Sequence, residues 1–320
     1  MKKKIFSYLF LVFWQINFGQ NTNVNGAPFL KEILIQFPNV RDLTISEQED
    51  EVYFTAQSFL GEISTIMTCK LKNGKWNDPQ IVAFSGKFQD LEPFLSPDQL
   101  RLYFVSNRPI DQKSTTSKDY DIWFVERQNR KSNWSVPKNL GAPINTNEDE
   151  FYPSIAISNN LYFTRDGQGS KGKDDIFMAQ WDNGKYHDPI SLSDAVNSNG
   201  YEFNAFFAPN ESFLIYTCYN RTDGFGSGDL YISYKNEKAE WSTAENLGIE
   251  INSAQMDYCP FVNLKTKKLY FTSKRSKLKK SFENNLNTNT FLEEVNQYEN
   301  GLSRIYVVDF SNFIKPSPKN

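Results

Sequence analysis

The feature that most restricts the fold of this chain is a repeat with a period of 50 to 59 residues. A hydrophobic strand with a central doublet occurs five times, as "EVYFTA", "RLYFVS", "NLYFTR", "FLIYTC" and "KLYFTS". The doublets begin at Tyr53, Tyr103, Tyr162, Ile215 and Tyr270. A fixed period of this length is typical of repeat architectures, in which copies of one supersecondary unit pack against each other.

Two further landmarks follow the doublets in a constant order. One is a strand that opens with aspartate in three copies, at Asp121, Asp175 and Asp229. The other is an aromatic residue three positions before a proline, at Trp76, Trp134 and Tyr186, with Trp241 as a weaker copy that lacks the proline. We interpret the aspartates and the three tryptophans as structural parts of the repeat.

Each repeat contains four antiparallel strands, which we call a to d in chain order. A short strand a precedes each doublet, and turns such as Ser96-Pro97-Asp98-Gln99 place proline where its fixed φ suits a tight turn. Runs such as Leu102-Tyr103-Phe104-Val105 lack polar alternation, which indicates a sheet buried on both faces. A four-stranded unit covered on both faces by its own copies is a propeller blade.

The length of the chain favours five blades, with six as the alternative, because six would leave no residues for a polar excursion at 276–301. We predict an all-β propeller over 28–313, with a short helix within the excursion and a tail at 314–320. A strand near the N-terminus is expected to complete the last blade and close the ring, which removes exposed sheet edges. The predicted blades are 40–82, 90–142, 150–193, 201–247 and 257–311, the last completed by 30–36.

The N-terminus has the pattern of a secretory signal. Lys2, Lys3 and Lys4 precede a short apolar run that is followed by polar residues, so we predict a leader at 1–20 and a periplasmic or secreted protein. The run is too short for an ordinary transmembrane helix, and no cysteine follows it to carry a lipid anchor. Removal of the three lysines changes the formal charge from −3 to −6, which argues against a nucleic-acid partner.

The segment "SPDQLRLYFVSNR…DYDIWFVE…WSVPKNLG" resembles the WD-like repeats of TolB-type secreted bacterial propellers. The resemblance covers nearly all of the mature chain and implies a propeller. TolB proteins carry an additional N-terminal domain, for which this chain has no room. Fold similarity of this kind does not specify a ligand.

Charged residues gather at one predicted face, because the start of strand a, the b–c loop and the d–a connection share it. Acids lie at the start of strand a, and an arginine follows strand b in four repeats. We predict a binding role for the set Asp90, Glu92, Glu150, Glu202, Asp257, Arg108, Arg165, Arg221 and Arg275. The structural alternatives are a polar rim for the acids and hairpin ion pairs between the arginines and the strand-c aspartates.

The three cysteines, Cys69, Cys218 and Cys259, are too few for a disulfide framework. Buried free thiols are the favoured interpretation, and a bridge between Cys218 and Cys259 is the alternative.

The residue types narrow the available chemistry. The single histidine, His187, argues against a Ser-His-Asp triad and a multi-histidine zinc site, and no G-x-S-x-G elbow occurs. The glycine-rich b–c loops lack the ligand spacing of an EF-hand, so we predict neither a metal nor a cofactor.

We therefore expect a non-catalytic binding or scaffold propeller of the bacterial cell envelope, which docks a protein, peptide or cell-wall ligand on its charged face. The alternative is a glycan-active enzyme, of the glycoside hydrolase or lyase type, that uses two propeller carboxylates. The oligomeric state is left open.

Overall fold

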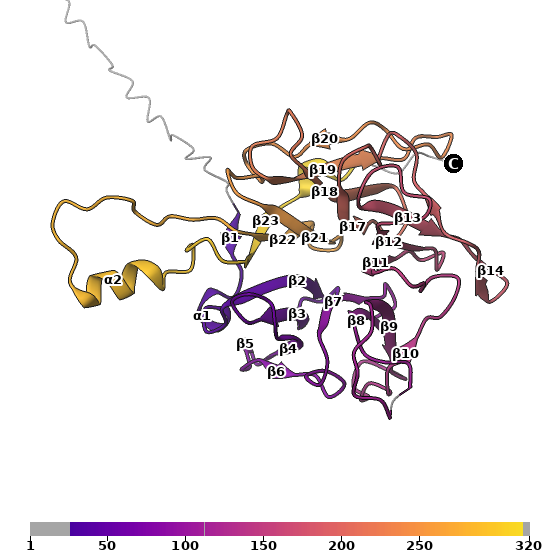
Figure 1. Ribbon diagram of the computed structural model, residues 1–320, viewed down its shortest axis with the longest axis horizontal. Coiled ribbons are helices and arrows are strands. Elements are labelled where there is room, and N and C mark those ends of the chain that lie inside the picture. The colour runs from indigo at the N-terminus through magenta and orange to yellow at the C-terminus, as the bar shows by residue number, and fades with distance from the viewer. Residues whose placement is uncertain (1–25, 112, 316–320) are drawn as a thin grey trace, which may run out of the picture.

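The computed structural model describes residues 26–111 and 113–315, and it is a five-bladed β-propeller (Figure 1). Five antiparallel sheets radiate from a common axis. In four of them the strands follow chain order from the centre outward, and in the fifth the outermost strand comes from the N-terminus. The predicted fold class is thus confirmed. The predicted leader at 1–20 lies outside the described residues. No helix within 26–111 or 113–315 is long and apolar enough to span a membrane.

The first two blades follow the predicted a-to-d order. Blade one comprises β2 (Asn39–Ile45), β3 (Glu51–Gln57), β4 (Ser64–Lys72), β5 (Lys75–Trp76) and β6 (Gln80–Ile81). Blade two comprises β7 (Asp90–Leu95), β8 (Arg101–Ser106), β9 (Asp121–Glu126) and β10 (Lys138–Asn139).

The remaining blades repeat this plan. Blade three comprises β11 (Glu150–Ile155), β12 (Leu161–Arg165), β13 (Asp175–Ala179) and β16 (Ile190–Ser191), with a side hairpin of β14 (Trp181–Asp182) and β15 (Lys185–Tyr186). Blade four comprises β17 (Glu202–Phe207), β18 (Phe213–Tyr219), β19 (Gly228–Tyr234) and β20 (Glu245–Asn246). Blade five comprises β21 (Asp257–Asn263), β22 (Lys268–Ser273), β23 (Arg304–Asp309) and β1 (Ala27–Pro28).

An N-terminal strand closes the ring, as expected, but it lies earlier than 30–36. Strand β1 pairs antiparallel with β23, with Ala27 opposite Val307. The segment assigned to this strand instead contains the short helix α1 (Lys31–Leu34). The apolar residues Leu30, Ile33 and Leu34 have the i, i+3, i+4 spacing of a helix, so one helical face can pack on the core.

Two tryptophans of the repeat, Trp76 and Trp134, connect neighbouring blades through contacts with other aromatic side chains. The indole Nε1 of Trp134 donates to the hydroxyl of Tyr53 in the preceding blade at 3.0 Å, and the rings meet edge to face. Trp76 packs edge to face on Phe29, which does the same on Tyr270 of blade five. Trp76 and Trp134 therefore act as contacts between blades.

The excursion at 276–301 forms an arm that projects from blade five (Figure 1). It carries the helix α2 (Thr288–Val295), whose start is fixed by a capping box between Asn287 and Thr290. After the arm the chain returns to β23 and ends its described part just beyond a 3₁₀ turn at Ser311–Phe313.

Candidate functional site

Four of the predicted acids open the innermost strands and are almost completely buried. Asp90, Glu150, Glu202 and Asp257 have exposed fractions of 0 to 1%. Each carboxylate accepts a hydrogen bond from a hydroxyl four or five residues earlier in the chain, from Ser85, Thr146, Ser198 and Ser253 respectively. These bonds fix the d–a connection against the start of the next blade.

The arginines after strand b pair with these acids rather than with the strand-c aspartates. Arg108 contacts Asp90, and Arg221 lies 3.0 Å from Glu202. Arg275 similarly lies 3.4 Å from Asp257. The structural alternative of hairpin ion pairs is therefore wrong for Arg108 and Arg221. Strand b lies between strands a and c, and the arginine reaches the acid of strand a.

Blade three departs from this pattern. Glu150 and Arg165 are opposite each other in the strand register, but the Arg165 guanidinium lies 4.4 Å from the centroid of the Phe177 ring. Burial raises the pKa of Glu150 to about 7, against the effect of its bonds from Thr146.

The strand-c aspartates hold the b–c loops. Asp175 and Asp229 accept hydrogen bonds from backbone N–H groups of their own glycine-rich loops. Asp121 accepts instead from the Lys118 ammonium and the Asn139 amide. In this conformation the charges of the predicted face are thus directed into their own blades and loops.

The fifth predicted acid, Glu92, lies elsewhere, at the centre of the propeller. One residue of each inner strand has a left-handed backbone, with φ between 50° and 57°, at the point where the strand register shifts. Such β-bulges redirect a side chain out of the regular alternation. The five bulge residues, which we call the central cluster, are Asp42, Glu92, Tyr152, Asn204 and Cys259.

The central cluster is joined by a hydrogen-bond network across all five blades, in which the Asn204 amide makes long bonds to Glu92 and Cys259. Arg41 donates through Nε to Asp42 Oδ1 at 2.7 Å and through Nη2 to Glu92 Oε1 at 2.9 Å. The thiol of Cys259 also donates to Asp42 Oδ1, at 2.7 Å. The backbone N–H of Tyr152 donates to Glu92 Oε2 at 2.6 Å. Two carboxylates, one arginine and one thiol therefore converge on the axis.

The repeat itself explains why Glu92 has this role. The residue after the doublet is threonine in four repeats, and its hydroxyl accepts the bulge N–H of the next blade at Thr55, Thr164 and Thr272. Blade two has Val105 at this position, which offers no acceptor. The Tyr152 N–H turns to the Glu92 carboxylate instead.

Burial dominates the electrostatics of the central cluster. It raises the pKa of Glu92 to about 7, the neighbouring Asp42 adds to this, and Arg41 opposes it. Burial and Asp42 also raise the pKa of the Cys259 thiol well above its ordinary range. Glu92 can therefore exchange a proton near neutral pH, whereas Cys259 stays a thiol.

The central cluster lies between two layers of side chains and is at most 6% exposed at any member. On one side Phe94, Phe206 and Phe261 pack together, with ring centroids 5.3 to 6.4 Å apart. On the other side the Arg41 guanidinium lies 5.2 Å from the centroid of the Tyr258 ring. The cluster is thus a closed polar layer in the described conformation.

Two hollows of the described surface lie on the opposite face, at the a–b turns. A cavity of about 750 Å³ runs between blades two and three, past Arg101, Glu126 and Trp134. An adjoining cavity of about 250 Å³ lies over the three phenylalanines of the axis. The two cavities share Ser96, Pro97 and Ile157, and we call them together the turn-face groove.

The sequence reasoning missed the central cluster and the turn-face groove. One signal for the cluster was available: Pro93, Pro153 and Pro260 directly follow bulge residues, and proline inside an inner strand is typical of a bulge. All three cysteines are buried free thiols, so Cys218 and Cys259 are not bridged. Within the described chain no group of three or more His, Cys, Asp or Glu side chains is arranged to hold a metal ion.

Known structures share this fold at very low sequence identity. No family model matches the chain, and no curated protein resembles it in sequence. A glycoside hydrolase superposes with a TM-score of 0.53 at 9% identity, over 88% of this chain and 91% of the other. A thermostable family-43 glycoside hydrolase gives 0.51 at 10% identity, over 88% and 96%.

TolB is also among the structural neighbours. TolB from Acinetobacter baumannii superposes with a TM-score of 0.45 at 12% identity, over 75% of this chain and 49% of the TolB chain. The chain thus corresponds to about half of that TolB. At these identities the likenesses show the propeller fold alone.

Proposed function

We propose that this chain is a non-catalytic binding propeller of the bacterial cell envelope, which holds an extended segment of a protein partner in the turn-face groove. The observation that carries the proposal is the groove itself, about 750 Å³ with an adjoining apolar cavity of about 250 Å³. The sequence pattern favours the charged face. Four of its acids are buried and bonded within their own blades and the connections before them, and the fifth, Glu92, lies at the axis.

The lining of the groove suits a peptide with an apolar anchor. The smaller cavity has an aromatic floor of Phe94, Phe206 and Phe261, which fits one large apolar side chain. The larger cavity adds Trp134 and the ion pair of Arg101 with Glu126, which is partly exposed and can hydrogen-bond to a peptide backbone. Aromatic anchors and arginines of this kind dominate the energetics of protein interfaces.

The test selects random phage-displayed peptides on the purified mature chain and measures their affinity for two variants. Ile157→Arg fills the junction of the two cavities, and Ile157 is 68% exposed, so the change should leave folding intact. Ile249→Arg is the matched control, because Ile249 is 62% exposed and lies in a d–a connection on the other face. We expect Ile157→Arg to weaken enriched peptides at least ~10-fold and Ile249→Arg to leave them unchanged.

Two results would contradict this proposal. One is the absence of any enriched peptide. The other is equal binding of the peptides by the wild type and Ile157→Arg. If only Ile249→Arg lost binding, the binding site would instead lie on the charged face.

One observation favours a glycan-active enzyme as the second candidate. Glu92, with a pKa near 7, and Asp42 both reach Arg41. Glycoside hydrolysis uses two carboxyl groups that flank the scissile bond, and these two side chains are the carboxyl groups that converge on the axis. The test is whether the wild type releases reducing sugar from envelope polysaccharides. Loss of this release in both Glu92→Gln and Asp42→Asn would establish this function in place of the first.

A further inference from the structure

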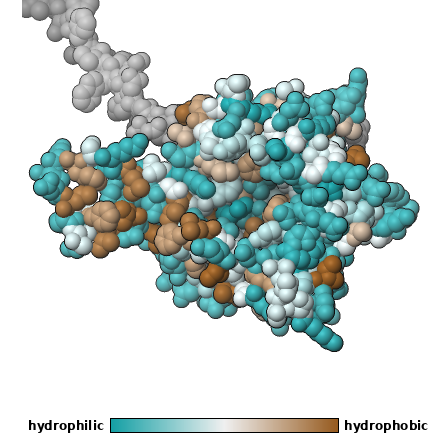
Figure 2. Space-filling model, in the orientation of Figure 1, coloured by the Kyte–Doolittle hydropathy of each residue, from teal (hydrophilic) through white to brown (hydrophobic). Residues whose placement is uncertain are grey.

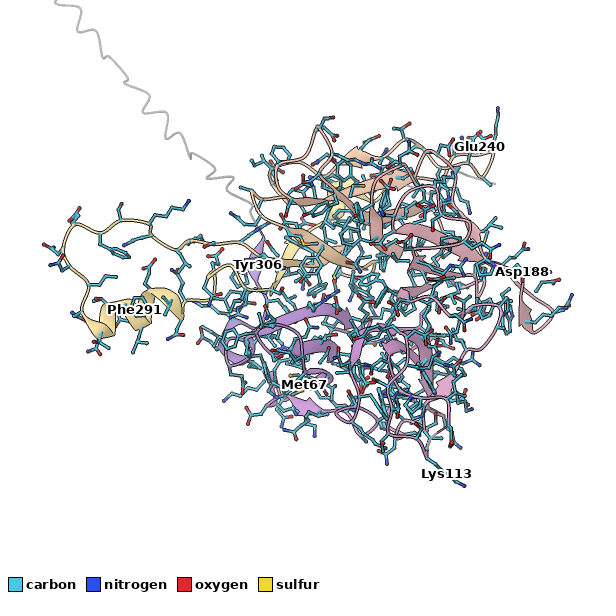
Figure 3. All side chains as sticks on the ribbon, viewed as in Figure 1. Met67, Lys113, Asp188, Glu240, Phe291 and Tyr306 are labelled. Carbon is cyan, nitrogen blue, oxygen red and sulfur yellow. The ribbon has the colours of Figure 1, made fainter. Side chains whose placement is uncertain are left out.

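The arm at 276–301 exposes several large apolar side chains to solvent. Phe291 and Leu292 of α2 are 51% and 48% exposed, and Leu278, Phe282 and Leu286 are 37 to 40% exposed. No residue of α2 is buried. Figure 2 shows apolar residues gathered over the arm, and Figure 3 shows Phe291 on α2, well apart from the packed side chains of the propeller. Exposed apolar patches of this kind typically mark interaction surfaces.

The base of the arm has a defined structure. Ser276 and Asn300 form a β-bridge, and the N–H of Lys277 donates to the carbonyl of Glu299 at 2.8 Å. The Lys277 ammonium lies 2.5 Å from the Glu299 carboxylate. The backbone N–H of Lys279 donates to the Glu294 carboxylate at 2.6 Å. The apolar side chains are therefore presented on a preformed hairpin, which lowers the entropic cost of binding.

The two limbs of the arm carry opposite charge. The first limb, 276–287, has three lysines and one glutamate, whereas the second limb, 288–301, has three glutamates and neither lysine nor arginine. The side chains of Lys279, Lys280 and Glu293 form no ion pair within the part of the chain that the structure describes. An arm with one basic and one acidic limb is complementary in charge to the same arm of a second copy that is related to it by a two-fold axis.

We propose that the arm pairs with the arm of a second copy of this chain to form a two-fold symmetric dimer. The basic limb of each arm lies against the acidic limb of the other, so that Lys279 and Lys280 face Glu293 and Glu294 twice. Phe291 and Leu292 of each copy cover the apolar side chains of the partner's first limb. This pairing removes the apolar patch from water and gives Lys279 and Lys280 carboxylate partners. The isolated chain provides neither of these two interactions.

The experiment measures the mass of the full mature chain by sedimentation velocity over a range of micromolar concentrations. The wild type is expected at twice the mass of one chain. Phe291→Ser with Leu292→Ser should weaken self-association at least ~10-fold. The matched control is Phe59→Ser with Leu60→Ser, an exposed Phe-Leu pair in a loop of blade one, which should leave the dimer unchanged.

Charge reversal tests the two-fold arrangement itself. Lys279→Glu with Lys280→Glu, and separately Glu293→Lys with Glu294→Lys, should each yield monomers, because both interface contacts become repulsive. An equimolar mixture of the two variants should recover a dimer that contains one chain of each. Three results would overturn the proposal. The wild type could be a monomer, or the dimer could survive the Phe291 and Leu292 substitutions. The third is binding of the arm to anionic lipid vesicles in place of self-association.

Discussion

At the scale of single residues, the threonine after the doublet forms a recurring pair with the bulge residue of the next blade, at Thr55, Thr164 and Thr272. Thr164 Oγ1 accepts the N–H of Asn204 at 3.1 Å, and both residues are buried. Thr217 occupies the same place in the next repeat, but its buried hydroxyl has no hydrogen-bond partner among the described residues. The same residue type at the same repeat position thus has two different energetic roles.

This difference predicts opposite outcomes for one substitution. Thr164→Val removes the acceptor of a buried N–H and should lower the free energy of unfolding by about 1 to 3 kcal/mol. Thr217→Val removes only an unsatisfied hydroxyl and should be neutral or stabilising. Urea denaturation of both variants measures the effect, and similar values for the two would contradict the assignment.

The raised pKa of Glu92 predicts a specific dependence of stability on pH. A carboxyl has a pKa of about 4.3 in the unfolded chain and about 7 at Glu92, so the folded state binds the proton more tightly. Stability should therefore fall as the pH rises from about 4.3 to 7, by on the order of 4 kcal/mol at most, and level off above.

Variants separate this contribution from those of other groups. Glu92→Gln should show a smaller loss of stability between pH 5 and pH 7.5 than the wild type. Glu150→Gln should remove a similar part, because the pKa of Glu150 is also raised to about 7. The measurement is urea denaturation at the two pH values, and a loss of wild-type size in Glu92→Gln would disprove the role of that carboxyl.

At the scale of elements, one buried ion pair joins blades one and two beneath the outer strands. Arg127 donates to both oxygens of Glu51, at 3.1 and 2.9 Å, and to the carbonyl of Gln99 at 2.9 Å. Its guanidinium lies 4.3 Å from the centroid of the Trp134 ring. Both side chains of the pair are at most 4% exposed.

Loss of one partner from this pair should be costly. Arg127→Met leaves a buried carboxylate without its bidentate donor and should destabilise the fold by about 3 kcal/mol. The Lys70 ammonium, 3.0 Å from the same carboxylate and nearly half exposed, compensates only part of the remaining charge, so adding Glu51→Gln should restore part of that loss. Thermal unfolding of the single and double variants measures both steps, and a double variant less stable than Arg127→Met would refute this account.

The elements show where sequence reasoning ends. The period of the doublets was enough to predict five blades, because each blade must bury both faces against its copies. It could not separate Asp90 from Glu92, two acids on one short strand. The bulge between the start of β7 and Phe94 sends Glu92 to the axis, whereas Asp90 stays in its blade. That outcome depends on partners from other blades, such as Arg41, which no local pattern records.

A second limit concerns short polar repeats. In "NLGAPIN" and "NLGIEIN" the final asparagines, Asn145 and Asn252, bond both the N–H and the carbonyl of a strand-c residue, Ile122 and Leu230. The repetition of these letters reflects hydrogen bonds that hold the connection to the next blade against strand c of the blade before it. It was visible in the sequence, but its role required the position of the strand it binds.

At the scale of the whole molecule, the stability of the ring depends on its closure by two residues at the start of the described chain. Strand β1 supplies only Ala27 and Pro28 to the outer edge of β23, and Phe29 adds a backbone bond to Ile305 at 2.9 Å. The Phe29 ring lies between Tyr270 of blade five and Trp76 of blade one. This segment therefore joins the last blade to the first.

Removal of residues 1–29 should open the ring at this seam and nowhere else. Without β1, the outer edge of β23 loses its partner and Tyr270 loses an aromatic contact, so amide exchange in β23 and β22 should accelerate at least ~10-fold by local opening. Strands β8 and β12, on blades away from the seam, should keep their wild-type protection. Trp241→Ala is the control, since it removes an edge-to-face aromatic contact with Phe207 in blade four, away from β22 and β23. If the ring depends on this closure, the loss of protection must be confined to the strands on the two sides of the seam. Uniform acceleration of exchange over all five blades, or no acceleration, would therefore contradict this dependence.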